Sequence, residues 1–428
     1  MSRWRYILLD ALARRGLSPV QGGKGIVVFT PGHLGDVLHV VPMLKALRAG
    51  KPEANIMWLV GPWSETLARR YSHYVDDIRI FAPQLPTFTR GRRDWQQSAW
   101  RQWRMARQLR AKGIDVFIGP LNGVGRFLAN ALAPRLWSGI GDRRPPRVQA
   151  GIRTVVQPYE KDRYEADAWC GLLTPLGIEV QADRLEYVVT PEERAAAVAF
   201  LRAEGVADSH PLALMAPGSG WSGKNWLPER FGEVAEWFSG FALGDCGSLD
   251  AAQGNPDHVE FEQPGSPDHG ECRDRPTESL RDGSEVGRPD SPRGRDRMSR
   301  SNGFQIAWVG GPGEESLVPT SRREDFNWVG KTSIPLLAAL MEQAKLFVGN
   351  DSGLLHIAAA LDVPTVSMWG PTSPGKWGPK GSIHRHIRKV ERCEGCIYWD
   401  YRETCRHDHV CMRAVQVDEV IQSVRDIL

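Results

Sequence analysis

Long apolar runs, net charge and cysteine are all scarce in this chain of 428 residues. No run approaches the roughly 20 apolar residues of a membrane-spanning helix, and the first residues lack the apolar core and cleavage site of a signal peptide. The net charge of +3 is too small to indicate a nucleic-acid-binding protein. Seven cysteines in so long a chain do not form a disulfide scaffold, which favours a reducing, cytoplasmic environment.

Short apolar runs alternate with segments of helical periodicity, and this alternation is typical of a doubly wound parallel α/β sheet. In the first half, buried strands are expected at residues 25–30, 55–60, 78–81, 114–118 and 136–140, with a basic helix over 94–112. The pattern restarts near residue 190 with a helix at 191–204. Further strands are expected at 212–215, 305–309, 327–329, 346–348 and 364–369, and further helices at 228–238 and from 334 to 344.

We therefore expect two Rossmann-like domains, over residues 21–188 and 189–415, followed by a terminal helix at 416–428. Residues 1–20 are expected to form a basic amphipathic helix, which suits the surface of an anionic membrane or packing on the flank of the first domain. Residues 240–303 lack periodicity and lysine, carry an acidic excess and hold only two aromatic residues. Such a segment cannot bury enough apolar surface to offset its ordering entropy, so we interpret it as a disordered insertion.

Three loops follow expected strands at the edge of a sheet where ligands of α/β folds bind. In residues 347–374 a strand leads through Asn-Asp-Ser-Gly into a helix, whose N-terminus can bind an anion, with Asp351 as its N-cap and His356 one turn further on. Lys224 ends a glycine-rich loop and can reach a phosphate, although a solvated loop lysine is the alternative. Glu314 and Glu315 follow another strand, where an acid can hold ribose hydroxyls or serve a helix dipole.

Arginines gather in two further segments. Arg90, Arg92 and Arg93 lie in the sequence TFTRGRR, and three more arginines lie within residues 143–147. Either group can contact an anionic ligand, and either can also be an ordinary solvated loop.

Four motifs in a fixed order make the chain resemble glycosyltransferase family 9, the lipopolysaccharide heptosyltransferases. They are GHLGDVLHVVPMLKAL at 32–47, APGSGWSGKNWLPERF at 216–231, WVGGPGEE at 308–315 and FVGNDSGLLHIAAALDVPTVSMWGPTSP at 347–374. The resemblance covers nearly the whole chain except residues 240–303. It implies a GT-B fold, in which two Rossmann-like domains face each other across a cleft. In such enzymes a terminal helix often crosses back to the first domain.

The resemblance also implies an activity and the residues that perform it. The expected reaction is an inverting transfer of a sugar, heptose from ADP-heptose in characterised members, to a lipopolysaccharide-type glycolipid. Asp36 would be the general base on the acceptor hydroxyl, whereas without the resemblance it would be interpreted as a helix N-cap. Lys224 would stabilise the leaving diphosphate and Glu314 or Glu315 would hold the ribose. The residues expected to cradle the diphosphate are Asp351, Ser352, Gly353 and His356.

The remaining expectations concern the acceptor, cofactors and location. Gly35 and the arginines at 90, 92 and 93 are expected to contact an anionic glycolipid acceptor. We expect no catalytic metal, because the chain lacks an Asp-x-Asp motif and supplies hydrogen-bond donors to the leaving group instead. The expected location is the inner face of the cytoplasmic membrane, where the enzyme binds peripherally.

The end of the chain carries a cluster of cysteines, Cys393, Cys396, Cys405 and Cys411, with two histidines between the last two. A structural zinc site, free thiols and disulfides all remain open interpretations. Two other functions compete with sugar transfer. An epimerase or hydrolase of sugar nucleotides would need a further acid in the first domain, and a degenerate binding scaffold would not need the intact polar residues described above.

Overall fold

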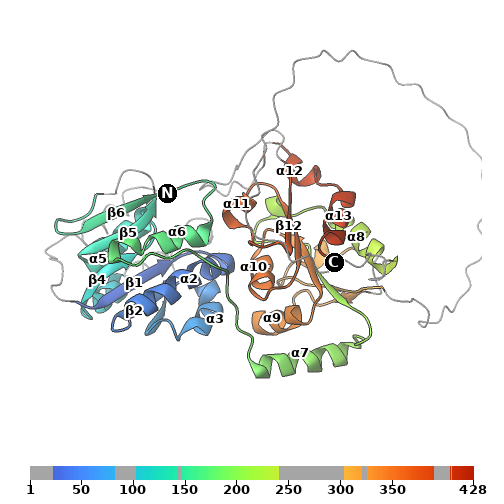
Figure 1. Cartoon of the computed structure of the whole chain (residues 1–428), viewed down its shortest axis with the longest axis horizontal. Coiled ribbons are helices and arrows are strands. Elements are labelled where there is room, and N and C mark those ends of the chain that lie inside the picture. Colours follow the sequence, from blue (N-terminus) through green and yellow to red (C-terminus); the bar gives the residue numbers. More distant parts are fainter. Residues whose placement is uncertain are drawn as a thin grey trace, which may run out of the picture.

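The computed structural model describes residues 23–81, 103–141, 147–240, 303–320, 325–389, 405 and 407–428. The expected N-terminal helix, almost all of the acidic insertion, the arginines at 90, 92 and 93 and two of the four clustered cysteines lie outside these residues. The chain forms two α/β halves that lie side by side (Figure 1).

The first half is built on a parallel six-stranded sheet in the order β3-β2-β1-β4-β5-β6. Its strands are β1 (Gly25–Thr30), β2 (Asn55–Val60), β3 (Asp77–Ile80), β4 (Ile114–Ile118), β5 (Leu136–Gly141) and β6 (Arg153–Pro158). Its helices are α2 (Leu34–Gly50), α3 (Glu65–Ala68), α5 (Gly123–Leu132) and α6 (Glu165–Gly171), and residues 103–110 are also helical. Because β1 is fully buried and central, the loop that follows it is held at the middle of the sheet edge.

The second half repeats this design in a parallel sheet of order β12-β11-β10-β7-β8-β9. Its strands are β7 (Leu212–Ala216), β8 (Gln305–Trp308), β9 (Phe326–Asn327), β10 (Leu346–Asn350), β11 (Thr365–Trp369) and β12 (His384–Arg388). Its helices are α7 (Pro191–Glu204), α8 (Pro228–Gly240), α9 (Ile334–Glu342), α10 (Gly353–Ala360), α11 (Pro374–Trp377), α12 (Val410–Arg413) and α13 (Val417–Arg425). The expected doubly wound sheets are therefore confirmed.

Several elements differ from the sequence-based expectation. The strand expected at 327–329 lies one residue earlier and ends at Asn327, because Asn327 accepts the Val329 N–H at a turn. The terminal helix α13 packs against α8, β11 and β12, so it stays with the second sheet instead of crossing back. Its buried face carries Val420 and Val424, which join the apolar core of that sheet.

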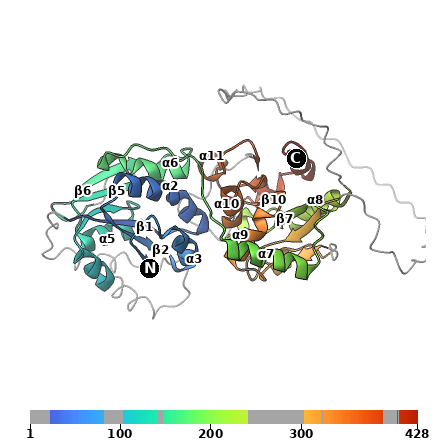
Figure 2. The same cartoon turned by 60° about the horizontal axis from the view of Figure 1, so that its bottom comes forward.

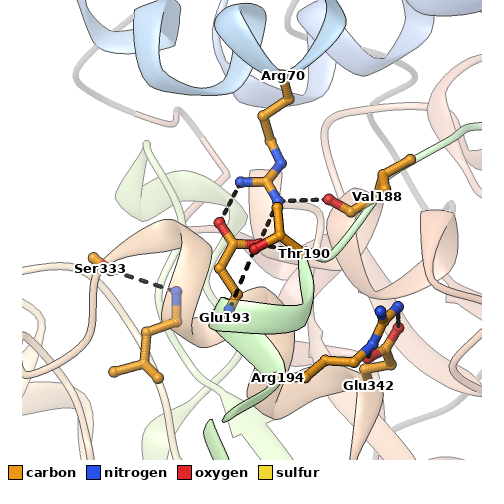
Figure 3. A network of polar contacts seen from close by, with 8 residues as sticks. Arg70, Val188, Thr190, Glu193, Arg194, Ser333 and Glu342 are labelled. Atoms are coloured by element: carbon orange, nitrogen blue, oxygen red, sulfur yellow. Dashed lines mark hydrogen bonds and ion pairs between the residues drawn. The ribbon is translucent and has the colours of Figure 1, made fainter. Parts of the chain in front are cut away.

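One of the apolar clusters extends across both halves, which meet along α2, α6, α10 and α11 (Figure 2). A second junction lies at η2 (Arg69–Tyr71) and the start of α7, where Arg70 forms a two-pronged ion pair with Glu193 at 2.7 and 2.5 Å (Figure 3). Glu193 also accepts the backbone N–H of the N-cap residue Thr190 and so completes the capping box of α7. The Arg70 guanidinium lowers the pKa of Glu193, although burial opposes this shift. These contacts fix the relative position of the two sheets.

Candidate functional site

A glycine-rich loop follows β7 and is tied at both ends to the strand beside it. Asn350, the last residue of β10, is fully buried. Its amide nitrogen donates to the Pro217 carbonyl at 2.7 Å, and its amide oxygen accepts the Trp226 N–H at 3.0 Å. Between these anchors the short helix η4 (Ser222–Lys224) ends on Lys224. Because both loop ends are fixed, Lys224 is held close to β10 rather than extended into solvent.

Lys224 forms an ion pair with Asp351, in which Lys224 Nζ lies 2.8 Å from Asp351 Oδ2. The same carboxylate oxygen of Asp351 accepts the Thr372 hydroxyl at 2.6 Å, and its other oxygen lies 3.8 Å from His356 Nε2. Burial would raise the pKa of Asp351, but the Lys224 ammonium and His356 outweigh burial and hold this pKa well below its usual range. Asp351 is therefore a buried carboxylate, and the expectation that it is the N-cap of the helix is wrong.

The N-cap of α10 is Ser352, and no side chain caps this helix. The first turn contains no acidic residue. Two buried polar atoms at this end, Ser352 Oγ and His356 Nδ1, have no hydrogen-bond partner among the described residues. The first backbone N–H groups of a helix carry partial positive charge. Together with Lys224 they make this end of α10 suitable for an anion.

The first turn of α2 is arranged differently. His33 is the N-cap, and Asp36 is the third residue of the helix, not the cap itself. The carboxylate of Asp36 accepts the His33 backbone N–H at 2.6 Å through Oδ2. It also lies against Gly32, where an added Cβ would be only 2.2 Å from Oδ2. Gly32 is thus required for the close approach of the carboxylate, which is half-buried and keeps a second oxygen for another partner.

The starts of α2 and α10 pack directly against each other. A Cβ added to Gly35 would lie 2.7 Å from His356 Cδ2, and one added to Gly353 would lie 3.0 Å from Leu34 Cβ. The His39 and His356 rings are 4.9 Å apart, edge to face. Burial, with a further contribution from His356, lowers the pKa of His39 to about 3, so this imidazole is neutral at ordinary pH. The structure therefore brings Asp36 and Gly35 next to the residues around Asp351.

The two glutamates after β8 occupy different positions. Glu314 is half-buried, accepts the Gly311 N–H at 2.7 Å, and lies so close to Gly218 that a Cβ there would come within 2.2 Å of its carboxyl carbon. Burial raises the pKa of Glu314. Glu315 is exposed and accepts the Gly313 N–H at 3.1 Å. Of the two, Glu314 is therefore the one that lies beside the glycine-rich loop that carries Lys224. A short 3-10 helix, η6 (Glu315–Leu317), follows Glu314.

A buried ion pair joins the two halves next to this site. Lys376, on α11, is 2% exposed and lies 2.8 Å from Glu165 on α6. Its ammonium also donates to the Glu160 carbonyl at 3.2 Å and lies 4.3 Å from the centre of the Tyr159 ring. Burial raises the pKa of Glu165 while Lys376 opposes this shift, and the charge of Asp36 adds to it. Sequence patterns gave no signal for this pair, because the two residues lie on separate halves.

Other expected features are only partly described. The cysteines at 393 and 396 lie outside the described residues, whereas Cys405 accepts the N–H groups of His407 and His409 and Cys411 is buried. Within the described ranges no three His, Cys, Asp or Glu side chains gather in a group that could hold a metal ion. No helix in the described part of the chain is long and apolar enough to cross a membrane.

Parts of the chain are similar in sequence to known proteins. Residues 297–407 match the model of glycosyltransferase family 9 (heptosyltransferase). Lipopolysaccharide heptosyltransferase 2 of Escherichia coli K12 is 41% identical over 96 residues, which are 21% of this chain and 28% of that protein. The sequence matches to the first curated relatives span about a fifth to a third of those proteins' length.

Solved structures resemble the fold over nearly its whole length. A family 9 glycosyl transferase from Veillonella parvula has a TM-score of 0.63 at 20% identity and covers 97% of this chain and 99% of its own. The E. coli ADP-heptose lipopolysaccharide heptosyltransferase II has a TM-score of 0.60 at 16% identity and covers 94% and 98%. These similarities confirm the fold that the sequence motifs implied.

Proposed function

We propose that the chain is a glycosyltransferase of family 9, which its match to that family's model over residues 297–407 supports, and that it transfers a sugar from a nucleotide donor to a lipopolysaccharide-core or related glycolipid. The proposed donor is ADP-heptose, by analogy with the structurally similar E. coli ADP-heptose lipopolysaccharide heptosyltransferase II. The observation that carries the proposal is the direct packing of two helix starts, one holding Asp36 and the other suited to an anion. A base and a leaving-group site are thereby brought together from opposite halves of the chain.

In the proposed reaction Asp36 removes the proton of the acceptor hydroxyl as that oxygen attacks the anomeric carbon of the donor. The new carbon–oxygen bond forms on the face opposite the bond to phosphate, which breaks, and the nucleoside diphosphate leaves with the bonding electron pair. The configuration at the anomeric carbon is therefore inverted. The oxygen of Asp36 that is not engaged by His33 is the one proposed to accept the proton.

The negative charge that develops on the leaving diphosphate requires compensation. We assign this role to Lys224, the first N–H groups of α10 at Ser352 and Gly353, and His356. Asp351 holds Lys224 in place and itself carries no donor, so its role in this proposal is to position the lysine. Glu314 would accept the ribose hydroxyls. Since these donors can replace a cation, the proposed transfer needs no metal.

The proposal is tested by incubating the purified full-length protein with ADP-heptose and a deacylated lipopolysaccharide-core oligosaccharide, with and without EDTA. Transfer is expected in both, with NMR of the product showing inversion. Asp36→Asn should lower kcat by about 10²- to 10⁴-fold without changing ADP affinity. Asp77→Asn, at an exposed ion pair of β3, is the matched control. Transfer that persists within tenfold in Asp36→Asn, or that EDTA abolishes, would contradict the mechanism.

We also propose that the acceptor is presented at a membrane surface. The basic sequence of residues 1–20 and the arginines at 90, 92 and 93 support a peripheral position on the inner face of the cytoplasmic membrane. Co-sedimentation with vesicles that contain anionic lipid tests this position. Equal binding by the full-length protein and a variant lacking residues 1–20 would rule out the helix as the anchor.

A further inference from the structure

His39 is a buried polar side chain at the junction between the two halves. It lies on α2 and is fully buried. Its ring packs against Tyr164 of the first half, with ring centres 5.5 Å apart. It also packs against His356 and Trp377 of the second half, with ring centres 4.9 and 5.7 Å away. Phenylalanine would fill the same space without removing a polar imidazole from water, so packing alone does not account for a histidine here.

One hydrogen bond fixes the tautomer of this imidazole. Burial lowers the pKa of His39 to about 3, so the ring carries a single N–H at ordinary pH. Its Nδ1 lies 2.7 Å from the Gly35 carbonyl oxygen. Because a carbonyl oxygen can only accept a hydrogen bond, the proton is on Nδ1. His39 therefore donates this N–H to Gly35, four residues earlier on the same helix.

The carbonyl that accepts this hydrogen bond belongs to the peptide group next to Asp36. A peptide group is planar, so a bond to the Gly35 oxygen also restrains the amide nitrogen of Asp36. Gly35 benefits from this restraint because glycine limits its own backbone less than other residues do. A residue with a Cβ would be strained there, since the Cβ would lie 2.7 Å from His356 Cδ2. The carboxylate of Asp36 is held separately, by the backbone N–H of His33 at 2.6 Å.

The His39 ring also touches the side of the site that is proposed to bind the diphosphate. His356 lies one turn into α10, and its Nε2 is 3.8 Å from Asp351 Oδ1. Sugar transfer requires the base and the departing group to be held at a fixed separation, and a displacement of about 1 Å can lower a rate by about 100-fold. A buried side chain that contacts both sides of the site can set this separation.

We propose that His39 is a positioning residue of the transfer reaction: its Nδ1–H orients the peptide group that carries Asp36, and its ring holds His356 of the opposite half in place. The inference rests on the proposed sugar transfer, in which Asp36 is the base and His356 contacts the diphosphate. His39 is fully buried and acts through these two neighbours. Its two contacts are separable, because phenylalanine keeps the aromatic contact and an amide side chain keeps the N–H donor.

The first test uses the full-length protein with ADP-heptose and a deacylated lipopolysaccharide-core oligosaccharide. His39→Phe removes the N–H donor but keeps the ring, so kcat should fall by about 10- to 100-fold. The KM for each substrate and the Kd for ADP should be those of the wild type. His384→Phe is the matched control, because His384 is also a buried histidine but lies on β12, where it bonds to Thr365. Its kcat should equal that of the wild type.

His39→Asn makes the opposite change. The amide nitrogen of asparagine can take the place of Nδ1 and donate to the Gly35 carbonyl, but the ring is lost. The kcat should return to within about fivefold of the wild type. ADP should bind about two- to threefold more weakly, because His356 loses its aromatic neighbour, and isothermal titration calorimetry measures this loss. His39→Gln, a better helix former with the same amide donor, is the second donor variant.

The order of the variants separates positioning from a merely structural role. Asparagine leaves a cavity where the ring was, so His39→Asn should unfold at a lower urea concentration than His39→Phe. A structural role alone would therefore make His39→Phe the more active variant. A kcat of His39→Phe within about threefold of the wild type would overturn the inference, and so would amide variants that are no more active than His39→Phe. A wild-type protein that binds ADP but transfers no sugar would refute the proposed function, and this inference with it.

Discussion

The starts of α2 and α10 have the same strand–loop–helix design but opposite electrostatics. In α2 the positive end of the helix dipole is balanced by the helix's own Asp36, whose carboxylate accepts the backbone N–H of the cap residue His33. In α10 the nearest carboxylate, Asp351, turns away toward Lys224 and Thr372, and no acid lies in the first turn. The difference supports the proposal that an anion binds at α10, whereas α2 presents a carboxylate. Substitutions at Lys224, His39 and Ser352 test this difference.

The largest effect is expected for Lys224→Met, which removes the cation from the α10 side. Sugar transfer should fall by about 100- to 1000-fold, because the leaving diphosphate loses a charged donor. Stability at pH 7 should fall by about 3 kcal/mol, since Asp351 is left buried without its cation. Steady-state kinetics and urea unfolding measure the two effects. Lys345→Met, at an exposed lysine before β10, is the control.

The double variant Lys224→Met/Asp351→Asn separates the two roles. Replacing the unpaired Asp351 carboxylate by a neutral amide should restore much of the stability but none of the transfer activity. If activity returned together with stability, Lys224 would act only as the partner of Asp351, and the assignment of the anion site to α10 would be wrong.

The next effect concerns pH and the buried histidine of α2. The pKa of His39 is about 3 in the folded chain, because burial disfavours its charge, and about 6.5 in an unfolded chain. As pH falls below 6.5, His39 becomes protonated in the unfolded chain but stays neutral in the folded chain, so stability falls. This residue alone should cost about 2 kcal/mol between pH 7 and pH 5.

Urea unfolding of His39→Phe at both pH values measures this cost. Phenylalanine preserves the aromatic contacts with Tyr164 and Trp377 but has no proton to gain. The variant should therefore lose less stability than the wild type between pH 7 and pH 5. His384, whose pKa burial lowers to about 4, contributes a similar acid sensitivity to both proteins and cancels in the comparison. Equal losses in both proteins would mean that His39 does not carry this proton linkage.

The smallest effect is expected for Ser352→Asp, which gives α10 an acid like that of α2. An aspartate is a good N-cap, so thermal stability should be retained. The new charge should weaken ADP binding by about fivefold, corresponding to about 1 kcal/mol. Ser333→Asp, at the N-cap of α9 in the same sheet, is the matched control. Isothermal titration calorimetry with ADP measures both variants, and equal affinities would place the diphosphate elsewhere.

The buried strands were predictable because a strand that is buried on both faces consists almost entirely of apolar residues, as in β1, β2 and β4. The strand β12 was missed since its sequence, HRHIR, is polar. Its two histidines are accommodated by hydrogen bonds to Thr365 and Ser367 on β11, which no local pattern reveals. The helix α5 was missed because two glycines in its first turn resemble a loop.

In the candidate site, too, residues with a local sequence pattern could be predicted, and residues whose role depends on distant parts of the chain could not. Asp36, Lys224 and Asp351 were recognisable because each follows a strand at the expected edge, and family resemblance supplied their order. Asn350 and His39 were not, because their roles depend on neighbours that are distant in the sequence. Asp351 was given the wrong local role for that reason. An aspartate before a helix is normally a cap, but here Lys224, 127 residues earlier, and Thr372 bind its carboxylate.

The buried ammonium of Lys376 has a consequence for how the two halves separate. Its partner Glu165 and the Glu160 carbonyl belong to the first half, whereas α11 follows the loop whose Thr372 holds Asp351. Pulling the halves apart here would rehydrate two charges and tug on that loop at the same time. Any movement that separates the two halves at Lys376 would therefore also disturb the contacts around Asp351.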